Sequence, residues 1–270
     1  MRIGLFGTGR VATALGPALT AVGHELVFVA ARTHASAQAL ATQLPGCVAL
    51  VLPLVQALPP ADLYLLAVPD AAVPAVLAAV AWPAGALVAH LAGALPVAVF
   101  AAQPQVRGGV LYPLQTFSPS RTIDWPAVPF FIEAPEAEAE AQLLALAHSL
   151  SQHVARLNSD QRLQLHLGAV FASNFTNHVL GIAHQLLAEA GLPFDLLAPL
   201  VRETVDKALG AQLGPFGVQT GPAARHDAPT LAAHTAALAA HPAWQSLYTQ
   251  LTQSIQAAEA ASVVRPPSPA

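Results

Sequence analysis

Three small residues near the start of the chain have the spacing of a phosphate-binding turn. Gly7, Gly9 and Ala12 form the pattern G-x-G-x-x-A directly after an apolar run. The first glycine permits a sharp bend out of a strand, the second lets the backbone approach a pyrophosphate, and the small third residue permits close packing of helix on strand. The following helix directs free N–H groups and its positive dipole end at the phosphates. We therefore expect dinucleotide binding by Gly7, Thr8, Gly9, Arg10, Val11 and Ala12, the alternative being a strand–turn–helix that binds no phosphate.

The end of the next apolar run indicates which dinucleotide is bound. An NAD site usually has an Asp or Glu roughly 20 residues after the glycines, to bind the ribose 2′-hydroxyl. Residues 30–33 read Ala-Ala-Arg-Thr, with no carboxylate nearby. Arg32 can contact a 2′-phosphate through two N–H groups, and Thr33 can add a hydroxyl donor. We expect NADP rather than NAD as the cofactor, unless Arg32 is only a solvated loop cation.

A polar stripe runs along an otherwise apolar, helix-like stretch at residues 160–190. At ~100° per residue, a narrow sector of that helix collects Arg162, His166, Ser173, Asn174, Asn177 and His184. A buried polar stripe needs partners, which a substrate or a nicotinamide amide would supply; the alternative is a stripe that faces solvent. His166 is the candidate acid or base toward a carbonyl or imine, because histidine ionises near neutral pH. Asn174 is a second catalytic candidate that would orient the substrate, and Ser173 is a candidate substrate contact.

Two further groups follow predicted strands, at the edge where open α/β sheets bind ligands. His90 comes directly after apolar residues 87–89 and is either catalytic or structural. Val68 and Pro69 are expected to pack over the nicotinamide ribose. Asp70 either belongs to that site or is the N-cap of the next helix.

A loop at residues 220–227 carries Arg225 and Asp227 two positions apart. Arg225 would clamp a substrate carboxylate or phosphate, and Asp227 would line the same site. Alternatively Asp227 caps the helix that follows, and Arg225 pairs with it. We expect no metal site, because the 11 histidines include no His-Glu-x-x-His motif and no pair four residues apart.

The composition excludes several classes of protein. A net charge of −4 with scattered arginines provides no basic stripe for nucleic acid. The mean hydropathy is high, at +0.52, but the longest apolar runs contain prolines or polar residues, so we expect no membrane span, no leader and a cytoplasmic protein. The single cysteine, Cys47, excludes an intrachain disulfide and a cysteine-based zinc site. Lys207 is the only lysine, so it alone is available for lysine chemistry.

These residues need a scaffold, and the first half of the chain alternates strand and helix patterns. Most of the strand patterns are continuously apolar, as is typical of a sheet covered by helices on both faces. Strands are predicted at 2–6, 25–31, 47–51, 63–68, 87–91, 110–111, 130–132 and 153–157, with helices at 11–22, 35–44, 71–80 and 136–151. The fold class is therefore α/β, a doubly wound Rossmann domain over residues 1–157.

The second half lacks convincing strands and predicts an all-α C-terminal domain over residues 158–258, for substrate binding and dimerisation. Its helices are predicted at 160–190, with a kink at Gly181, and at 194–209, 230–240 and 243–258. Residues 259–270, with three prolines after position 264, are predicted to be a disordered tail. Long helices after a Rossmann domain favour a homodimer.

Several motifs together resemble a bacterial family that joins an N-terminal Rossmann-like NADP-binding domain to a C-terminal helical domain of unknown function. Its relatives are pyrroline-5-carboxylate reductase and the 6-phosphogluconate and hydroxyacid dehydrogenases. The resemblance covers about residues 1–255 and rests on these motifs: G-T-G-R-V-A at 7–12, V-P-D at 68–70, H-L-A-G at 90–93, Y-P-L-Q-T-F at 112–117, L-H-L-G-A with A-S-N at 165–174, and T-G-P-A-A-R-H-D at 220–227. The resemblance implies a Rossmann fold with NADP as the cofactor, and it places Gln115 among the substrate-binding candidates.

The chain departs from the family pattern at positions that bear on catalysis. Ala92 stands where the pattern has a serine, Tyr112 where it has a histidine, and Leu165 where it has a tyrosine. The lysine that the dehydrogenase relatives carry on the long helix is also absent. Two functions follow: an NADP-dependent oxidoreductase moving hydride between nicotinamide and a small carbonyl, imine or hydroxyl substrate, or a non-catalytic nucleotide-binding or scaffolding protein on the same fold.

Overall fold

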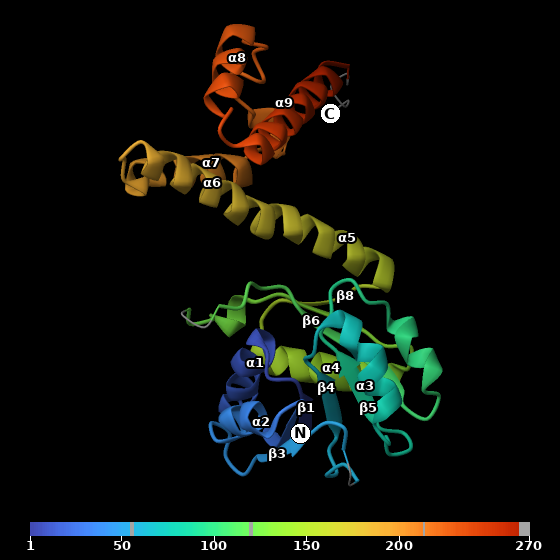
Figure 1. The fold of residues 1–270 in the computed structure, drawn as a ribbon. Helices are drawn as coiled ribbons and strands as arrows, with labels where there is room; N and C mark the ends of the chain where they lie inside the picture. The colour runs from blue at the N-terminus through green and yellow to red at the C-terminus, as the bar shows by residue number, and fades with distance from the viewer. Residues whose placement is uncertain (55–56, 119–120, 213, 265–270) are drawn as a thin grey trace. The chain divides into compact units, whose positions relative to one another are not determined.

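A computed structural model describes residues 1–54, 57–118, 121–212 and 214–264. The chain divides into two compact units, Met1–Phe175 and Thr176–Ala270 (Figure 1). This division places α5 (Ser159–Ala169) in the first unit, whereas the sequence predicts that the helical domain begins at residue 158. That domain boundary remains a prediction.

The first unit is built on an eight-stranded sheet in the order β3-β2-β1-β4-β5-β6-β7-β8. Its strands are β1 (Arg2–Phe6), β2 (Glu25–Ala31), β3 (Val48–Val51), β4 (Leu63–Leu66), β5 (Leu87–His90), β6 (Arg107–Pro113), β7 (Phe130–Glu133) and β8 (Val154–Arg156). Neighbours pair in parallel, except that β6 and β7 are antiparallel. This order, with crossovers on both sides of β1, confirms the predicted doubly wound α/β fold.

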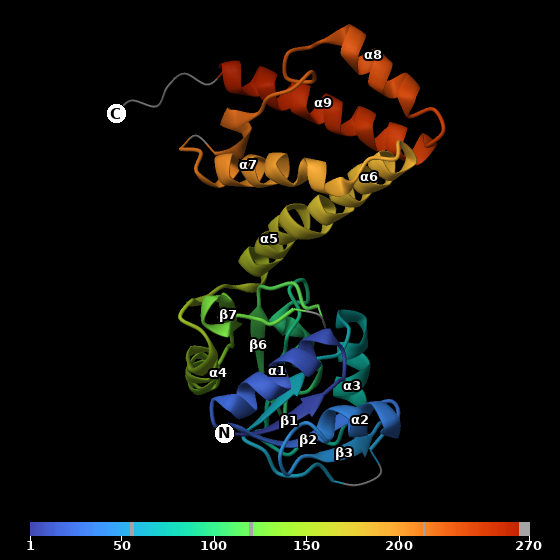
Figure 2. The same cartoon turned by 90° about the vertical axis from the view of Figure 1, so that its left-hand side faces the viewer.

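Helices cover both faces of this sheet, as Figure 2 shows for α1 and α3. The helices of the unit are α1 (Arg10–Ala21), α2 (His34–Ala41), α3 (Val73–Ala79), α4 (Ala137–Leu150) and α5, with short 3₁₀ turns at Asp70–Ala72, Val97–Ala102 and Trp125–Ala127. One core cluster joins α1, α2 and α4 to the sheet through residues such as Leu15 and Leu143. The other joins α3 and the Val97–Ala102 turn to Phe28 and Tyr64. The carboxyl edge of the sheet is left free for the loops that carry the candidate site.

The long helical stretch is regular only in part. A capping box between Asn158 and Gln161 begins α5, and a π-helical segment, Val170–Phe175, separates it from α6 (Thr176–Glu189). The irregularity therefore lies at Val170–Phe175 and not at Gly181, where the sequence predicts a kink. Gly181 lies inside α6. An α-helix tolerates an isolated glycine at a modest cost in stability, so this residue need not cause a kink.

The second unit is all helical over its described residues, in agreement with the predicted class. Besides α6 it contains α7 (Ala198–Leu209), α8 (Ala228–Ala237), α9 (Pro242–Val264) and 3₁₀ turns at Phe194–Leu197 and Pro215–Val218. Helix α9 continues to Val264, so residues 259–264 are helical and the predicted tail is wrong there; the rest of that tail, 265–270, lies outside the described residues. No helix among the described residues is both long and apolar enough to cross a membrane.

Candidate functional site

A cavity of about 680 Å³ lies at the carboxyl ends of β1, β2 and β4. One side is formed by the glycine turn, Gly7 to Gly9, and another by Arg32, Thr33 and Ser36 at the start of α2. Val68, Pro69, Ala72 and Val76 supply an apolar wall. The sheet topology thus brings three predicted motifs, far apart in sequence, to one concave surface.

The backbone of the turn requires glycine at position 7 and leaves open space beside Gly9. Gly7 has φ +110°, and an added Cβ would overlap the backbone carbonyl of Ala67. Its N–H donates to the Ala30 carbonyl at 2.8 Å, which holds the turn against β2. A Cβ on Gly9 would meet no protein atom within 4 Å. Gly9 is also the N-cap of α1 and offers no side-chain cap, so the first N–H groups of that helix remain available to a ligand.

Arg32 is exposed and makes no ion pair or hydrogen bond with any described residue. Thr33 is the N-cap of α2, where its hydroxyl accepts the Ser36 N–H at 3.3 Å and lies 2.6 Å from the Ser36 hydroxyl. Ser36 therefore belongs to this group, although the sequence analysis did not select it. The T-x-x-S capping spacing was the available signal.

The other residues of the glycine motif have different surroundings. Ala12 is fully buried in the core and acts through helix packing, as predicted. Val11 is partly buried and packs against the same core. Arg10 does not line the main cavity. It lines a separate hollow of about 270 Å³ together with Arg121.

A second group of polar residues gathers beyond β5 and β6. The Tyr112 hydroxyl lies 3.0 Å from Nδ1 of His166, which α5 supplies. The two rings meet edge to face, with centroids 5.9 Å apart. Gly93, in the loop after β5, leaves the space for this contact. Burial, and next the negative charge of Asp70, raise the pKa of Tyr112, while Arg162 opposes them, so the phenol stays protonated at neutral pH.

Helix α5 is anchored one turn before His166. Arg162 is 1% exposed and forms an ion pair with Glu133 at the end of β7. The guanidinium also donates to the Leu95 carbonyl at 2.5 Å, and Glu133 accepts the Ser159 N–H at 2.9 Å. Because Arg162 and His166 are four residues apart, the same helical face carries the anchor and the candidate acid.

His90 is fully buried, and its geometry favours the structural alternative. Its Nδ1 accepts the Ala92 N–H at 3.2 Å, which leaves the ring proton on Nε2, and the ring stacks on Phe100. Burial, and next the charge of Arg162, lower the pKa of His90 to about 3. The Pro96 carbonyl acts in the opposite direction, although Nε2 makes no hydrogen bond of normal geometry. A neutral, inaccessible imidazole is a poor proton donor at neutral pH.

Of the remaining candidates, Ser173, Asn174 and Gln115 do not join either group within the described structure, whereas the charge of Asp70 acts on Tyr112. Ser173 and Asn174 lie in the π-helical segment, where Ser173 is partly buried and Asn174 is exposed. Gln115 is exposed and accepts the Thr116 N–H. Asp70 is the first residue of a 3₁₀ turn and makes no capping hydrogen bond.

The loop at residues 220–227 resolves in favour of capping. Asp227 is the N-cap of α8 and accepts the Thr230 N–H at 3.2 Å and the Thr230 hydroxyl at 2.8 Å. These hydrogen bonds lower the pKa of Asp227, with a smaller effect from the charge of Arg225. Arg225 itself is exposed.

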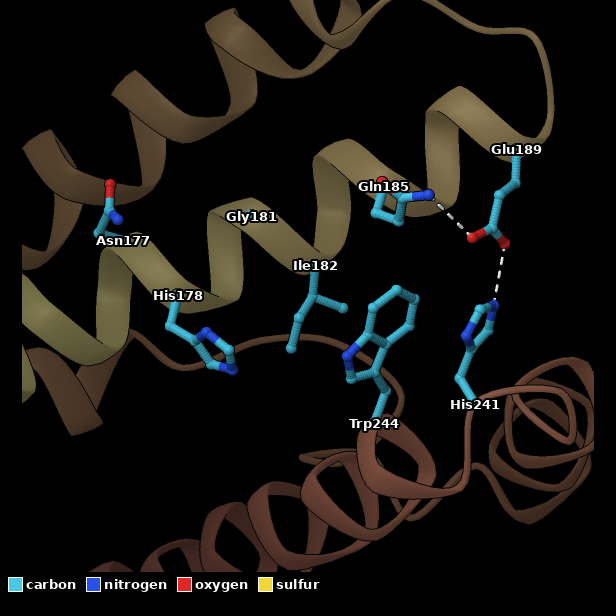
Figure 3. Close-up of a pocket in the computed structure, with 8 residues that line it drawn as sticks. All are labelled: Asn177, His178, Gly181, Ile182, Gln185, Glu189, His241 and Trp244. Atoms are coloured by element: carbon cyan, nitrogen blue, oxygen red, sulfur yellow. Dashed lines mark hydrogen bonds and ion pairs between the residues drawn. The ribbon is translucent and has the colours of Figure 1, made fainter.

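The second unit has a cavity of its own, of about 520 Å³, between α6 and the start of α9 (Figure 3). Two side chains contact the Glu189 carboxylate: Nε2 of His241 lies 2.9 Å from Oε2, and Nε2 of Gln185 donates to Oε1 at 3.2 Å. The Trp244 indole stacks against the His241 ring. Apart from Asn177, none of the polar-stripe residues lines this cavity. The His241–Glu189 contact connects the last residue of α6 to the residue before α9, which accounts for these two side chains without a ligand.

Among the described residues, no cluster of three or more His, Cys, Asp or Glu side chains is arranged to hold a metal ion.

Comparison with known proteins identifies relatives of both halves. A Rossmann-like domain matches residues 1–116, and a domain of unknown function (DUF2520) matches residues 128–255. A Bacteroides fragilis structure described as a "putative NADP oxidoreductase" is 39% identical, with a TM-score of 0.84, and the alignment covers 94% of this chain and 97% of that one. Among curated proteins, none matches this sequence.

More distant structures share the fold. A reductive aminase from Aspergillus terreus, in complex with NADPH and ethyl levulinate, has 20% identity and a TM-score of 0.68, covering 95% of this chain and 93% of that one. A 1-pyrroline-5-carboxylate reductase from Streptococcus pyogenes has 14% identity and a TM-score of 0.59, covering 95% and 98%.

Proposed function

Because this chain belongs to the family of proteins that join a Rossmann-like domain to a DUF2520 domain, we propose that it is an NADP-dependent oxidoreductase. Its substrate is a small carbonyl, imine or hydroxyl compound. The observation that carries the proposal is the cavity where the glycine turn, the α1 N-terminus and Arg32, which pairs with none of the described residues, meet. The 39% identical relative, described as a "putative NADP oxidoreductase", supports the same assignment.

The residues present fit this cofactor. The open space beside Gly9 and the uncapped α1 N-terminus suit a pyrophosphate, which needs close backbone approach and N–H donors. The 2′-phosphate would be held by Arg32 and by the Thr33 and Ser36 hydroxyls. Val68 and Pro69 would pack against the nicotinamide ribose. The chemistry that the bound nucleotide supplies is hydride transfer.

The chain's own catalytic contribution is a proton. We assign that proton to His166, because it is partly exposed and held in a fixed place by Tyr112. Asn174 and Ser173 follow on the same helical stretch and would orient the substrate. Gln115 and Arg225 remain candidates for substrate contact, each exposed in the described structure.

A homodimer is part of this proposal. Large apolar side chains are exposed in the second unit, including Leu200 at 62% and Phe216 at 74%. We infer that these side chains belong to a surface for association. A second copy would cover it.

The first test is cofactor binding followed by turnover. Calorimetric titration of the unmutated protein should show tighter binding of NADPH than of NADH. Equal affinities would contradict the role of Arg32, and binding of neither would remove the dinucleotide assignment.

Turnover of NADPH against a panel of keto acids, imines and aldehydes then separates an enzyme from a non-catalytic nucleotide-binding protein. The substitutions at Ala92 and Tyr112, and the missing lysine on the long helix, are the observations that favour the second function. NADPH binding without turnover of any panel compound would support it.

A further inference from the structure

The contact between Tyr112 and His166 joins elements that are 54 residues apart in sequence. Tyr112 lies on β6, within a buried strand end, and His166 lies on α5 one turn after the buried Arg162. Both ends of the contact are therefore held by packed secondary structure. Because neither partner is on a loose surface segment, the contact fixes the orientation of the His166 ring.

The loop after β5 makes room for the pair. A Cβ on Gly93 would lie 2.5 Å from His166 Nδ1 and 3.0 Å from Tyr112 Cζ. Real Cβ atoms essentially never show the shorter of these separations. Glycine at position 93 is thus a condition of the Tyr112–His166 contact.

The hydrogen bond distinguishes the two nitrogens of His166. A hydroxyl accepts as well as donates, so Tyr112 can accept the Nδ1–H of His166, and a neutral ring held in this way has its unprotonated nitrogen at Nε2. Nε2 makes no hydrogen bond with any described residue, and the His166 side chain is partly exposed. One nitrogen is held inside the protein and the other is available to a ligand.

We propose that Tyr112 is a positioning residue that holds Nδ1 of His166 and thereby fixes the orientation of the ring, so that Nε2 is the atom that passes a proton to the substrate. This inference rests on the proposed oxidoreductase function. The proton leaves Nε2 of the His166 imidazolium for the substrate oxygen or nitrogen, and the ring becomes neutral imidazole, which takes a proton back from solvent. A hydroxyl both donates and accepts, so Tyr112 stays bonded to Nδ1 when the ring is charged and when it is neutral.

The first measurement needs neither cofactor nor substrate. In ¹⁵N-labelled protein, the ring signals of His166 are assigned as those missing from His166→Gln. With the ring neutral, the unmutated protein should show a single Nδ1–H tautomer, which is the ring left when Nε2 has given up its proton, and Tyr112→Phe should show a mixture of both. Tyr64→Phe is the matched control, because it removes another buried phenol that bonds the Pro59 carbonyl and does not touch His166.

Gly93→Ala provides an independent route to the same loss. The added methyl displaces the His166 ring and leaves the Tyr112 hydroxyl in the chain. It should produce the same tautomer mixture as Tyr112→Phe. Identical His166 signals in the unmutated protein and in both folded variants would overturn the inference.

Activity provides the second measurement, with any panel compound that is turned over. Tyr112→Phe should lower kcat about tenfold and leave the Kd for NADPH unchanged, whereas His166→Gln should lower kcat about a hundredfold. If the unmutated protein does not bind NADPH, the result would count against the proposed function. Normal NADPH binding with an unchanged kcat in Tyr112→Phe would count against the role of Tyr112 alone.

Discussion

Replacing Glu133 by Gln should destabilise the first unit by about 3 kcal/mol, because it leaves the Arg162 guanidinium buried without a counter-charge. Breaking a buried pair typically costs about 3–5 kcal/mol. We place Glu133→Gln at the lower end, because the Glu133 side chain is 16% exposed and water reaches it. Glutamine keeps the size and an acceptor oxygen for the Ser159 N–H, so the substitution isolates the charge.

In thermal unfolding, a loss of about 3 kcal/mol corresponds to a fall in Tm of roughly 6–12 °C for a unit of this size. The matched control is Glu140→Gln, which removes an ion pair with Arg156 whose side chains are 27% and 64% exposed. Such exposed pairs contribute about 0–1 kcal/mol. The double variant Glu133→Gln with Arg162→Met should recover much of the loss, since no buried charge remains. A fall in Tm for Glu133→Gln no larger than for Glu140→Gln would refute the reasoning.

Other predictions concern the cofactor, pH and assembly. Arg32→Ala should weaken NADPH binding about tenfold to a hundredfold, because a charge-assisted hydrogen bond contributes roughly 1.5–3 kcal/mol. Calorimetry should find NADH binding nearly unchanged, and Arg202→Ala, an exposed arginine on α7, should alter neither affinity. The pKa of His90 is about 3 in the folded state and near 6.5 in an unfolded chain, so the unfolded state binds more protons between these values. Stability should therefore fall as the pH drops through that window, by up to about 1.4 kcal/mol per pH unit; His90→Gln should reduce this slope in urea unfolding, and an equal slope in both proteins would contradict the burial argument. Sedimentation at micromolar concentration should show a dimer, and a species of only 27.8 kDa would contradict it.

Much of the fold could be predicted because its signals are local. The strands at Arg2–Phe6 and Glu25–Ala31 have the predicted bounds, since continuous apolar runs of this length suit strands covered on both faces. The antiparallel pairing of β6 with β7 carried no such signal, because strand direction depends on the path of the connection between them. The π-helical segment at Val170–Phe175 was likewise invisible to a pattern that assumes a period of 3.6 residues.

The residues of the candidate site likewise divide into those with a local sequence signal and those that depend on tertiary contacts. The sequence by itself located the glycine turn, because the motif's spacing and the backbone freedom of Gly7 are local properties, and it selected Arg32, which lines the same cavity. For Asp227 the sequence allowed either substrate binding or a helix N-cap, and the hydrogen bond from the Thr230 N–H shows the N-cap.

Only the tertiary structure decided which polar side chains meet. Tyr112 was visible in the sequence as a departure from the family pattern, but nothing local linked it to His166, 54 positions later. His90 and His166 both looked like candidate acids, and burial separated them: one is enclosed against Phe100 and kept neutral, while the other keeps a nitrogen free. Protonation and access depend on the surroundings of a side chain, and those surroundings exist only once the sheet and α5 have packed together.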